Sequence, residues 1–270
     1  MQNEREMFVL HSRTKGMSLR HLIFVVAFAV WVMQAAAQAQ NGEVTECDRL
    51  AASDIDFQRN SEPVAFKNID PSLAIPACTK AATESKNSSR ISYQLGRSLL
   101  AGKKWMEGLK HIRLAAEAGY AAAQLALGDI YESASFGMVQ DQKEAELWIE
   151  KAAKQNNPKA QFRLGQRLAQ ANDQTKAFGW YCRSAEEGDA DAQASLGIAY
   201  LEGKAWIGAP SDPVRASEWL AKAAAQGQRM AQQNLALLQQ QTRGKLNARA
   251  KGSDKCDEVI KCLESGRVCR

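Results

Sequence analysis

The stretch "AQASLGIAYLEG" at residues 192–203 decides the fold, because the chain repeats it in recognisable copies. "AQLALGDIYESA" begins at Ala123, and "AQFRLGQRLAQA" begins at Ala160. In each copy alanine, leucine and aromatic residues recur at spacings of three and four, which predicts an amphipathic helix. A glycine inside a helix costs about 1 kcal/mol relative to alanine. Because the glycine is repeated despite that cost, we expect a neighbouring helix to pack closely against it.

A second repeated segment is rich in alanine and precedes each of these copies. Its copies include "HIRLAA", "WIEKAA", "WYCRSA" and "WLAKAA", beginning at His111, Trp148, Trp180 and Trp219. A residue suited to a turn follows each alanine pair, at Ser85, Gly119, Asn156, Gly188 and Gly227. Glycine and asparagine accept the left-handed conformation that ends a helix. Each unit is therefore predicted to be a helix hairpin, and stacking would bury the apolar face that one hairpin leaves exposed.

The combined pattern "AQxxLGxxY" followed by "AxxWxxKAAxxG" resembles the Sel1-like repeat family, a relative of the tetratricopeptide repeats. The resemblance covers residues 90–240 and implies an all-α solenoid of stacked antiparallel helix hairpins, a superhelix. Residues 40–89 are expected to form a divergent N-terminal hairpin, whose first helix would be "ECDRLAASDIDF" from Glu46. Residues 241–270 are expected to form a basic tail that contains cysteines.

The first 39 residues have the pattern of a signal peptide. Leu22–Met33 is an apolar run of 12 residues, followed by small residues with an A-x-A cleavage site. Such a run is short for a membrane span and typical of a secretory signal. Translation from Met17 would give a more ordinary start, and an uncleaved inner-membrane anchor is the alternative. The repeats and the signal together indicate a bacterial protein that is periplasmic or secreted.

All six cysteines lie after the predicted cleavage site. An even number of cysteines in an exported chain favours disulfides, and their spacing does not fit a tetrahedral zinc site. Alignment of the repeat units places Cys78 inside the N-terminal hairpin, opposite Cys47, so a Cys47–Cys78 disulfide is expected. Cys182 aligns with Arg113, Glu150 and Ala221, a position that tolerates charge, and we expect it to be exposed and to pair with the tail. The pairing among Cys182, Cys256, Cys262 and Cys269 stays open.

The sequence contains no constellation typical of an enzyme. His111 is the one histidine after position 39, and its alignment with tryptophans of other units favours a role in helix packing. Motifs for nucleophilic serine, phosphate binding or metalloprotease chemistry are absent. After position 39 there are 31 basic and 28 acidic residues, a balance that gives no sign of nucleic-acid binding. We therefore expect no enzyme activity, no cofactor and no metal.

The surface formed by the first helix of each unit is the candidate binding site. Stacked hairpins expose such a face to protein partners. The positions expected to contact a partner are Arg97, Asp129, Arg163 and Gln166. The family resemblance implies adaptor or regulatory work, so we predict an exported, non-enzymatic scaffold that binds a protein partner in an envelope process. The alternative is a cell-wall ligand binder, or a relative that binds penicillin or weakly hydrolyses β-lactams. Those relatives carry a cysteine pair in nearly every repeat, and this chain does not.

Overall fold

The structure is a computed structural model that describes residues 44–85, 88–203, 211–242, 256 and 259–261. Within these ranges no strand occurs, and the elements are helices joined by turns and loops. They are α3 (Glu46–Ala51), η1 (Phe66–Asn68), α4 (Pro71–Glu84), α5 (Ser89–Ala101), α6 (Trp105–Glu117), α7 (Ala121–Ser133), η2 (Ser135–Gly137), α8 (Gln142–Lys154), α9 (Pro158–Gln170), α10 (Gln174–Glu186), α11 (Ala190–Glu202), α12 (Pro213–Ala225) and α13 (Arg229–Thr242). The predicted signal peptide and most of the predicted tail lie outside the described residues.

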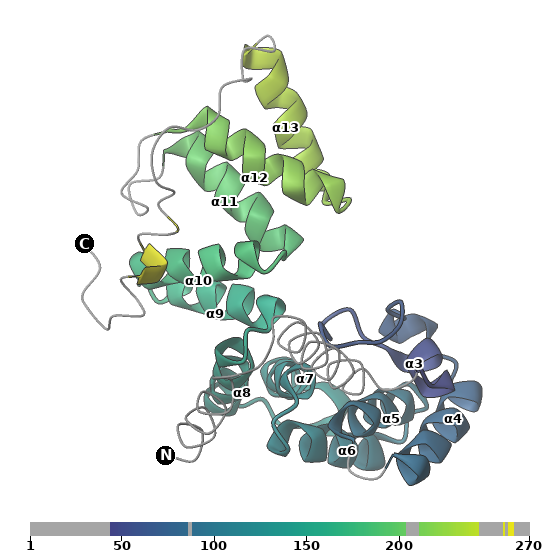
Figure 1. Ribbon diagram of the computed structural model, residues 1–270. Helices are drawn as coiled ribbons and strands as arrows, with labels where there is room; N and C mark the ends of the chain where they lie inside the picture. The colour runs from purple at the N-terminus through teal and green to yellow at the C-terminus, as the bar shows by residue number, and fades with distance from the viewer. Residues whose placement is uncertain (1–43, 86–87, 204–210, 243–255, 257–258, 262–270) are drawn as a thin grey trace, which may run out of the picture. The chain divides into compact units, whose positions relative to one another are not determined.

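Helices α5 to α12 pair in sequence order into four antiparallel hairpins, α5/α6, α7/α8, α9/α10 and α11/α12 (Figure 1). The repeated glycine lies where the two helices of a hairpin cross. A Cβ added to Gly128 would come within 2.7 Å of Ile149 and 3.1 Å of the Ala145 carbonyl oxygen. At Gly197 the added Cβ would come within 2.6 Å of Leu220. The predicted close approach is thus confirmed: the glycine costs helix stability locally and permits tight packing between helices.

The turns after the second helices have the predicted left-handed residue, with one exception. Gly119, Gly188 and Gly227 have φ angles of 88°, 95° and 84°, and Asn156 has 58°. Ser85 differs, because its φ is −104° and it caps α4 in another conformation. The first unit therefore leaves its second helix differently from the later units.

A row of glutamines joins each hairpin to the preceding one. The side-chain amides of Gln124, Gln161, Gln193 and Gln232 each donate to the carbonyl oxygen of the residue eight positions earlier, at 3.0 to 3.4 Å. The amide of Gln155 donates in turn to the Gln124 side-chain oxygen at 2.6 Å, and Gln226 does the same for Gln193 at 2.9 Å. At the equivalent position beside Gln161 the chain has Glu187, a carboxylate that cannot donate. The buried Gln161 side-chain oxygen consequently has no hydrogen-bond partner among the described residues.

The N-terminal unit departs from the predicted hairpin. Its first helix, α3, ends at Ala51, and the chain then continues as irregular backbone up to η1. The predicted helix "ECDRLAASDIDF" is therefore wrong in its second half. A threonine–aspartate capping box at Thr45 and Asp48 starts α3, and a disulfide joins Cys47 to Cys78 of α4, with the two Cα atoms 4.5 Å apart. No helix in the described part of the chain is long and apolar enough to span a membrane.

Candidate partner-binding face

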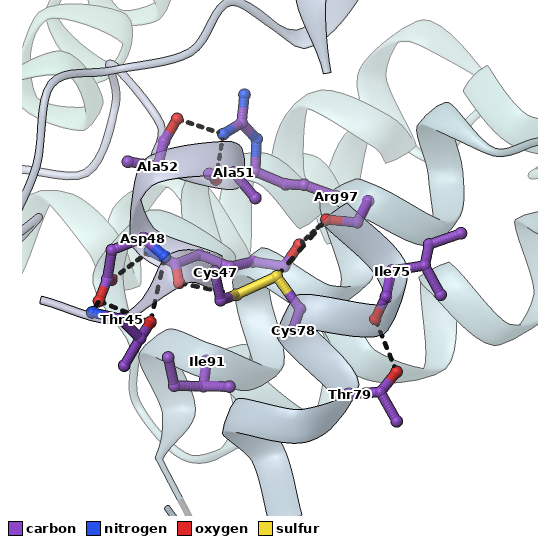
Figure 2. Close-up of a disulfide and its surroundings, with 12 residues drawn as sticks. Thr45, Cys47, Asp48, Ala51, Ala52, Ile75, Cys78, Thr79, Ile91 and Arg97 are labelled. Carbon is purple, nitrogen blue, oxygen red and sulfur yellow. Dashed lines mark hydrogen bonds between the residues drawn. A yellow bond between two sulfur atoms is a disulfide. The ribbon is translucent and has the colours of Figure 1, made fainter. Parts of the chain in front are cut away.

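Arg97 lies on the first helix of its hairpin, as the sequence predicts, but it is not available to a partner. Its side chain is 6% exposed. Nη1 donates to the carbonyl oxygens of Ala51 and Ala52 at 2.6 Å each, and Nη2 donates to that of Val64 at 3.0 Å (Figure 2 shows the first two). The assignment of Arg97 to a partner-binding surface is corrected accordingly. Its guanidinium holds a segment of its own chain.

That segment, residues 52–64, is called the N-terminal loop below. Its ends meet, because the Val64 amide donates to the Ala52 carbonyl oxygen at 2.9 Å. The loop bonds to residues of three successive hairpins. The Tyr93 hydroxyl of α5 donates to Ser53 at 3.2 Å, and the Asn157 side-chain amide donates to the Ile55 carbonyl oxygen at 2.9 Å. Asn157 also caps α9 with its side-chain oxygen. The start of one repeat is thereby tied to a residue 102 positions earlier in the chain.

Buried charge and hydroxyl groups reinforce this contact. The Tyr120 hydroxyl donates to Asp56 at 2.6 Å. Burial raises the pKa of the Asp56 carboxyl, while the hydrogen bond from Tyr120 opposes that rise. Burial also raises the pKa of Tyr93 to about 12 and raises the pKa of Tyr120, so both tyrosines stay protonated donors at neutral pH. Ile55 packs against two apolar clusters, one formed by the first and second hairpins and one formed by the second and third.

Two of the other predicted contact residues, Asp129 on α7 and Arg163 on α9, are brought together by the fold. The Arg163 guanidinium lies 3.1 Å from the Asp129 carboxylate and also pairs with Glu132. Arg167 joins the same cluster, at 2.7 Å from Glu132. These side chains are partly exposed, and salt bridges of that kind contribute about 1 kcal/mol or less. The cluster links two neighbouring first helices and leaves part of Arg163 accessible, because its side chain is 37% exposed.

Equivalent positions on the first helices α5, α7 and α9 differ in exposure. Arg97, Asp129 and Gln166 each follow the repeated glycine of their helix. Arg97 is buried under the N-terminal loop, Asp129 is half-buried and Gln166 is exposed. The first-helix face, meaning the surface of α5, α7, α9 and α11, is therefore occupied at its start and accessible at α9.

His111 borders a surface cavity of about 490 Å³, which is lined mainly by Ser85, Ser88, Ser92 and Leu114. Ser92 donates to the His111 carbonyl oxygen at 3.2 Å, and its hydroxyl lies 3.4 Å from the ring nitrogen Nδ1. Burial lowers the pKa of His111, which keeps the ring neutral at neutral pH. The ring is half-buried against the α5 helix, in keeping with a packing role. Among the described residues no group of histidine, cysteine and acidic side chains could hold a metal ion.

Cys182 differs from its expected exposure. It is fully buried in α10 and bonded to Cys256, and Val259 packs into the same core. Cys256 and Val259 pack at a position that has Arg113 or Glu150 in other units, and this explains the difference. Cys262 and Cys269 lie outside the described residues.

The segments that match a known protein family coincide with individual hairpins. Residues 121–157, 158–189 and 190–228 each match the Sel1 repeat family. These hairpins are Sel1 repeats. The first match coincides with the hairpin α7/α8, the second with α9/α10 and the third with α11/α12. Members of the Sel1 family are mostly scaffolds without enzyme activity, and their repeats mediate contacts between proteins.

Solved structures extend the likeness beyond the three matched Sel1 repeats. A Sel1 repeat protein from Oxalobacter formigenes is 25% identical, with a TM-score of 0.56, over 74% of this chain and 81% of that one. The c5321 protective antigen of uropathogenic Escherichia coli is also 25% identical, with a TM-score of 0.54, over 73% of this chain and 45% of that one. The described part of the chain is therefore an all-α solenoid of Sel1 type.

One curated relative matches in sequence. Chitin synthase regulatory factor 3 of Schizosaccharomyces pombe is 32% identical over 136 residues, which make up 47% of this chain. The matched region spans only 14% of the length of that relative. The similarity therefore covers about half of this chain and a small part of the relative.

Several residues of the face were not found from the sequence. Tyr93, Tyr120 and Asn157 act on the N-terminal loop, yet each also fits an ordinary helix or turn position. The available signal was Tyr120, which stands at the N-cap position where α9 and α11 have the capping residues Asn157 and Asp189. The sequence did not indicate that these residues bind the N-terminal loop, because the loop has no repeat pattern.

Proposed function

We propose that this protein is an exported scaffold that binds a protein partner in the bacterial periplasm and works as an adaptor or regulator of an envelope process. The partner contacts the first-helix face at α9, through Gln166 and the accessible parts of Arg163 and Asp129. One observation carries this proposal: the same face, in the preceding hairpins, already holds a polypeptide. The N-terminal loop is bound there through its backbone carbonyl groups, by Arg97 and Asn157.

Two further observations support the compartment and the type of role. The disulfides Cys47–Cys78 and Cys182–Cys256 are suited to an oxidising compartment. The fission yeast relative is named as a regulatory factor of a synthase, and a regulatory role on another protein is consistent with a chain of helix hairpins. Sequencing of the exported protein from its N-terminus should begin at Gln38 or Gln40, and a form that retains Leu22–Met33 would contradict export with cleavage.

Photo-crosslinking in the living cell tests the binding face. A photoreactive amino acid at Gln166 should yield a discrete crosslinked product in the periplasmic fraction. The matched control places the same group at Glu146, an exposed residue on the second helix α8, and should yield none. Products from Glu146 with none from Gln166 would place the partner elsewhere. Retention of the protein on peptidoglycan or labelling by a β-lactam, with no crosslinked protein, would favour the cell-wall ligand alternative.

A further inference from the structure

The turn between α5 and α6 carries an exposed group of basic and apolar side chains. It consists of four consecutive exposed residues, Lys103, Lys104, Trp105 and Met106. Trp105 is 48% exposed and Met106 is 83% exposed. Neither lysine has an ion-pair partner among the described residues. These four residues are called the α5–α6 tip.

The start of α6 lacks the capping aspartate that the other described second helices have. Helices α4, α8, α10 and α12 begin with a capping aspartate, Asp70, Asp141, Asp173 and Asp212, whose carboxylate accepts from backbone amides. Helix α6 begins with Lys104, and no side chain caps it. A lysine there cannot accept a hydrogen bond, and its charge opposes the positive end of the helix dipole. The sequence therefore gives up local stability at this helix alone among the second helices described.

The backbone conformation of Lys103 is a second unfavourable feature of the tip. Lys103 has a φ of 59°, and its equivalent in the α9–α10 turn, Asn172, has 64°. Asparagine tolerates this left-handed conformation, whereas lysine is uncommon in it. The equivalent turn continues with Asp173, Gln174 and Thr175, which are polar or able to cap a helix. The α9–α10 turn thus has the same geometry with better-suited residues. The strain that remains in the α5–α6 turn points to a function of its side chains.

We infer that the α5–α6 tip is the point at which this protein contacts an anionic membrane surface. Lysines beside an anionic bilayer are attracted to its phosphate groups, and tryptophan is favoured at the level of the head groups. Met106, which is more exposed than Trp105, can bury its apolar side chain at the acyl boundary. The first turn of α4 borders Gly102 through Pro71 and Ile75 and carries Leu73, 57% exposed. Acidic groups nearby are Glu107 and the capping Asp70, so the contact is peripheral and reversible.

The α9–α10 turn supplies the test, because its residues can be grafted onto the tip. The variant K103N/K104D/W105Q/M106T gives the α5–α6 turn the residues of its equivalent. The protein used begins at Gln40, without the apolar N-terminal run, and contains the compact unit of residues 45–270. The starting protein should sediment with vesicles of phosphatidylglycerol and phosphatidylcholine, less with pure phosphatidylcholine, and less at high salt. The graft should weaken vesicle binding about tenfold or more while its Tm stays equal or rises.

Two partial grafts separate the contributions and give outcomes that would overturn the inference. K103N/K104D should abolish the preference for phosphatidylglycerol, and W105Q/M106T should reduce binding to both kinds of vesicle. Unchanged sedimentation of the full graft would overturn the inference. So would binding to soluble polyglutamate with none to vesicles, which would assign the tip to an acidic polypeptide. A marked fall in Tm of the graft would show that the lysines serve the fold. None of these results depends on crosslinking at Gln166.

Discussion

The start of the first-helix face and its continuation at α9 are built from the same repeat, yet they differ in what covers them. At α5 the residue after the repeated glycine is Arg97, buried with three carbonyl oxygens of the chain as acceptors. At α9 the equivalent residue is Gln166, which is exposed. The difference teaches that the face binds polypeptide where its side chains supply hydrogen-bond donors that reach backbone carbonyls.

The covered part also has a structural purpose. An end unit of a stacked array has no neighbour on its outer side and needs a cap. Helices α3 and α4, joined by the Cys47–Cys78 disulfide, pack against α5 and fill that role, and the N-terminal loop adds polar contacts to three hairpins. The later hairpins are stabilised by repeat-to-repeat contacts such as the glutamine row. Stability is thus supplied in two different ways in the two parts of the chain.

The largest expected effect is one that both parts should share. Gly128→Leu and Gly165→Leu each force a side chain into a helix crossing, where even a Cβ meets Ile149 or Tyr181 at under 3 Å. Each should lower the free energy of unfolding by about 3 kcal/mol or more, measured by urea titration followed by circular dichroism. Gln166→Leu, one residue beyond Gly165 and exposed, is the control and should change little. A small loss of stability for Gly165→Leu, together with a large loss for Gly128→Leu, would mean that the two helices of the α9/α10 hairpin pack less closely than those of α7/α8.

Removal of the N-terminal disulfide should weaken the covered part. The double variant C47A/C78A opens a loop of about 30 residues, worth about 3 to 4 kcal/mol in the chain-entropy model. Limited proteolysis should then cut first within residues 52–64, and urea unfolding gives the loss of stability. Peptide mapping without reduction should recover Cys47 linked to Cys78 in the unmodified protein. A Cys47 peptide linked to Cys182 would disprove the description of the N-terminal unit.

Two arginines on equivalent faces distinguish the parts directly. Arg97→Met removes the guanidinium donor from three carbonyl oxygens, of which only that of Ala52 keeps the Val64 amide as a donor, and should cost about 3 kcal/mol. Arg163→Met removes a partly exposed ion pair and should cost about 1 kcal/mol or less. Chemical denaturation of both variants in the same buffer measures the difference. Equal losses would mean that Arg163 is as deeply engaged as Arg97, and the accessible face at α9 would have to be abandoned.

The smallest expected effect is a gain. Glu187→Gln places a donor beside the unpaired Gln161 side-chain oxygen and should stabilise the protein by about 1 kcal/mol. The matched reverse change, Gln155→Glu, removes the donor to Gln124 and should destabilise it by a similar amount. Both are measured as shifts in Tm by calorimetry. No gain from Glu187→Gln would indicate that water already satisfies Gln161.

The sequence by itself determined the hairpins, their order and the glycine crossings. These features depend on residues a few positions apart, or on the same pattern repeated along the chain, so periodicity reveals them. The capping aspartates Asp141 and Asp173 and the turn residues Gly119 and Gly188 are local signals of the same kind. The Cys47–Cys78 pair could be expected for the same reason, because alignment of the units places both cysteines in one hairpin.

Only the tertiary structure decided which part of the first-helix face is covered. The contact of Asn157 with Ile55 joins residues 102 positions apart, and nothing in the spacing of either residue indicates it. The same holds for Arg97, whose charge suggested an exposed site, and for Cys182, whose equivalents in other units include the charged Arg113 and Glu150. A buried guanidinium is stable only where acceptors surround it, and those acceptors are backbone carbonyls, which carry no sequence signal.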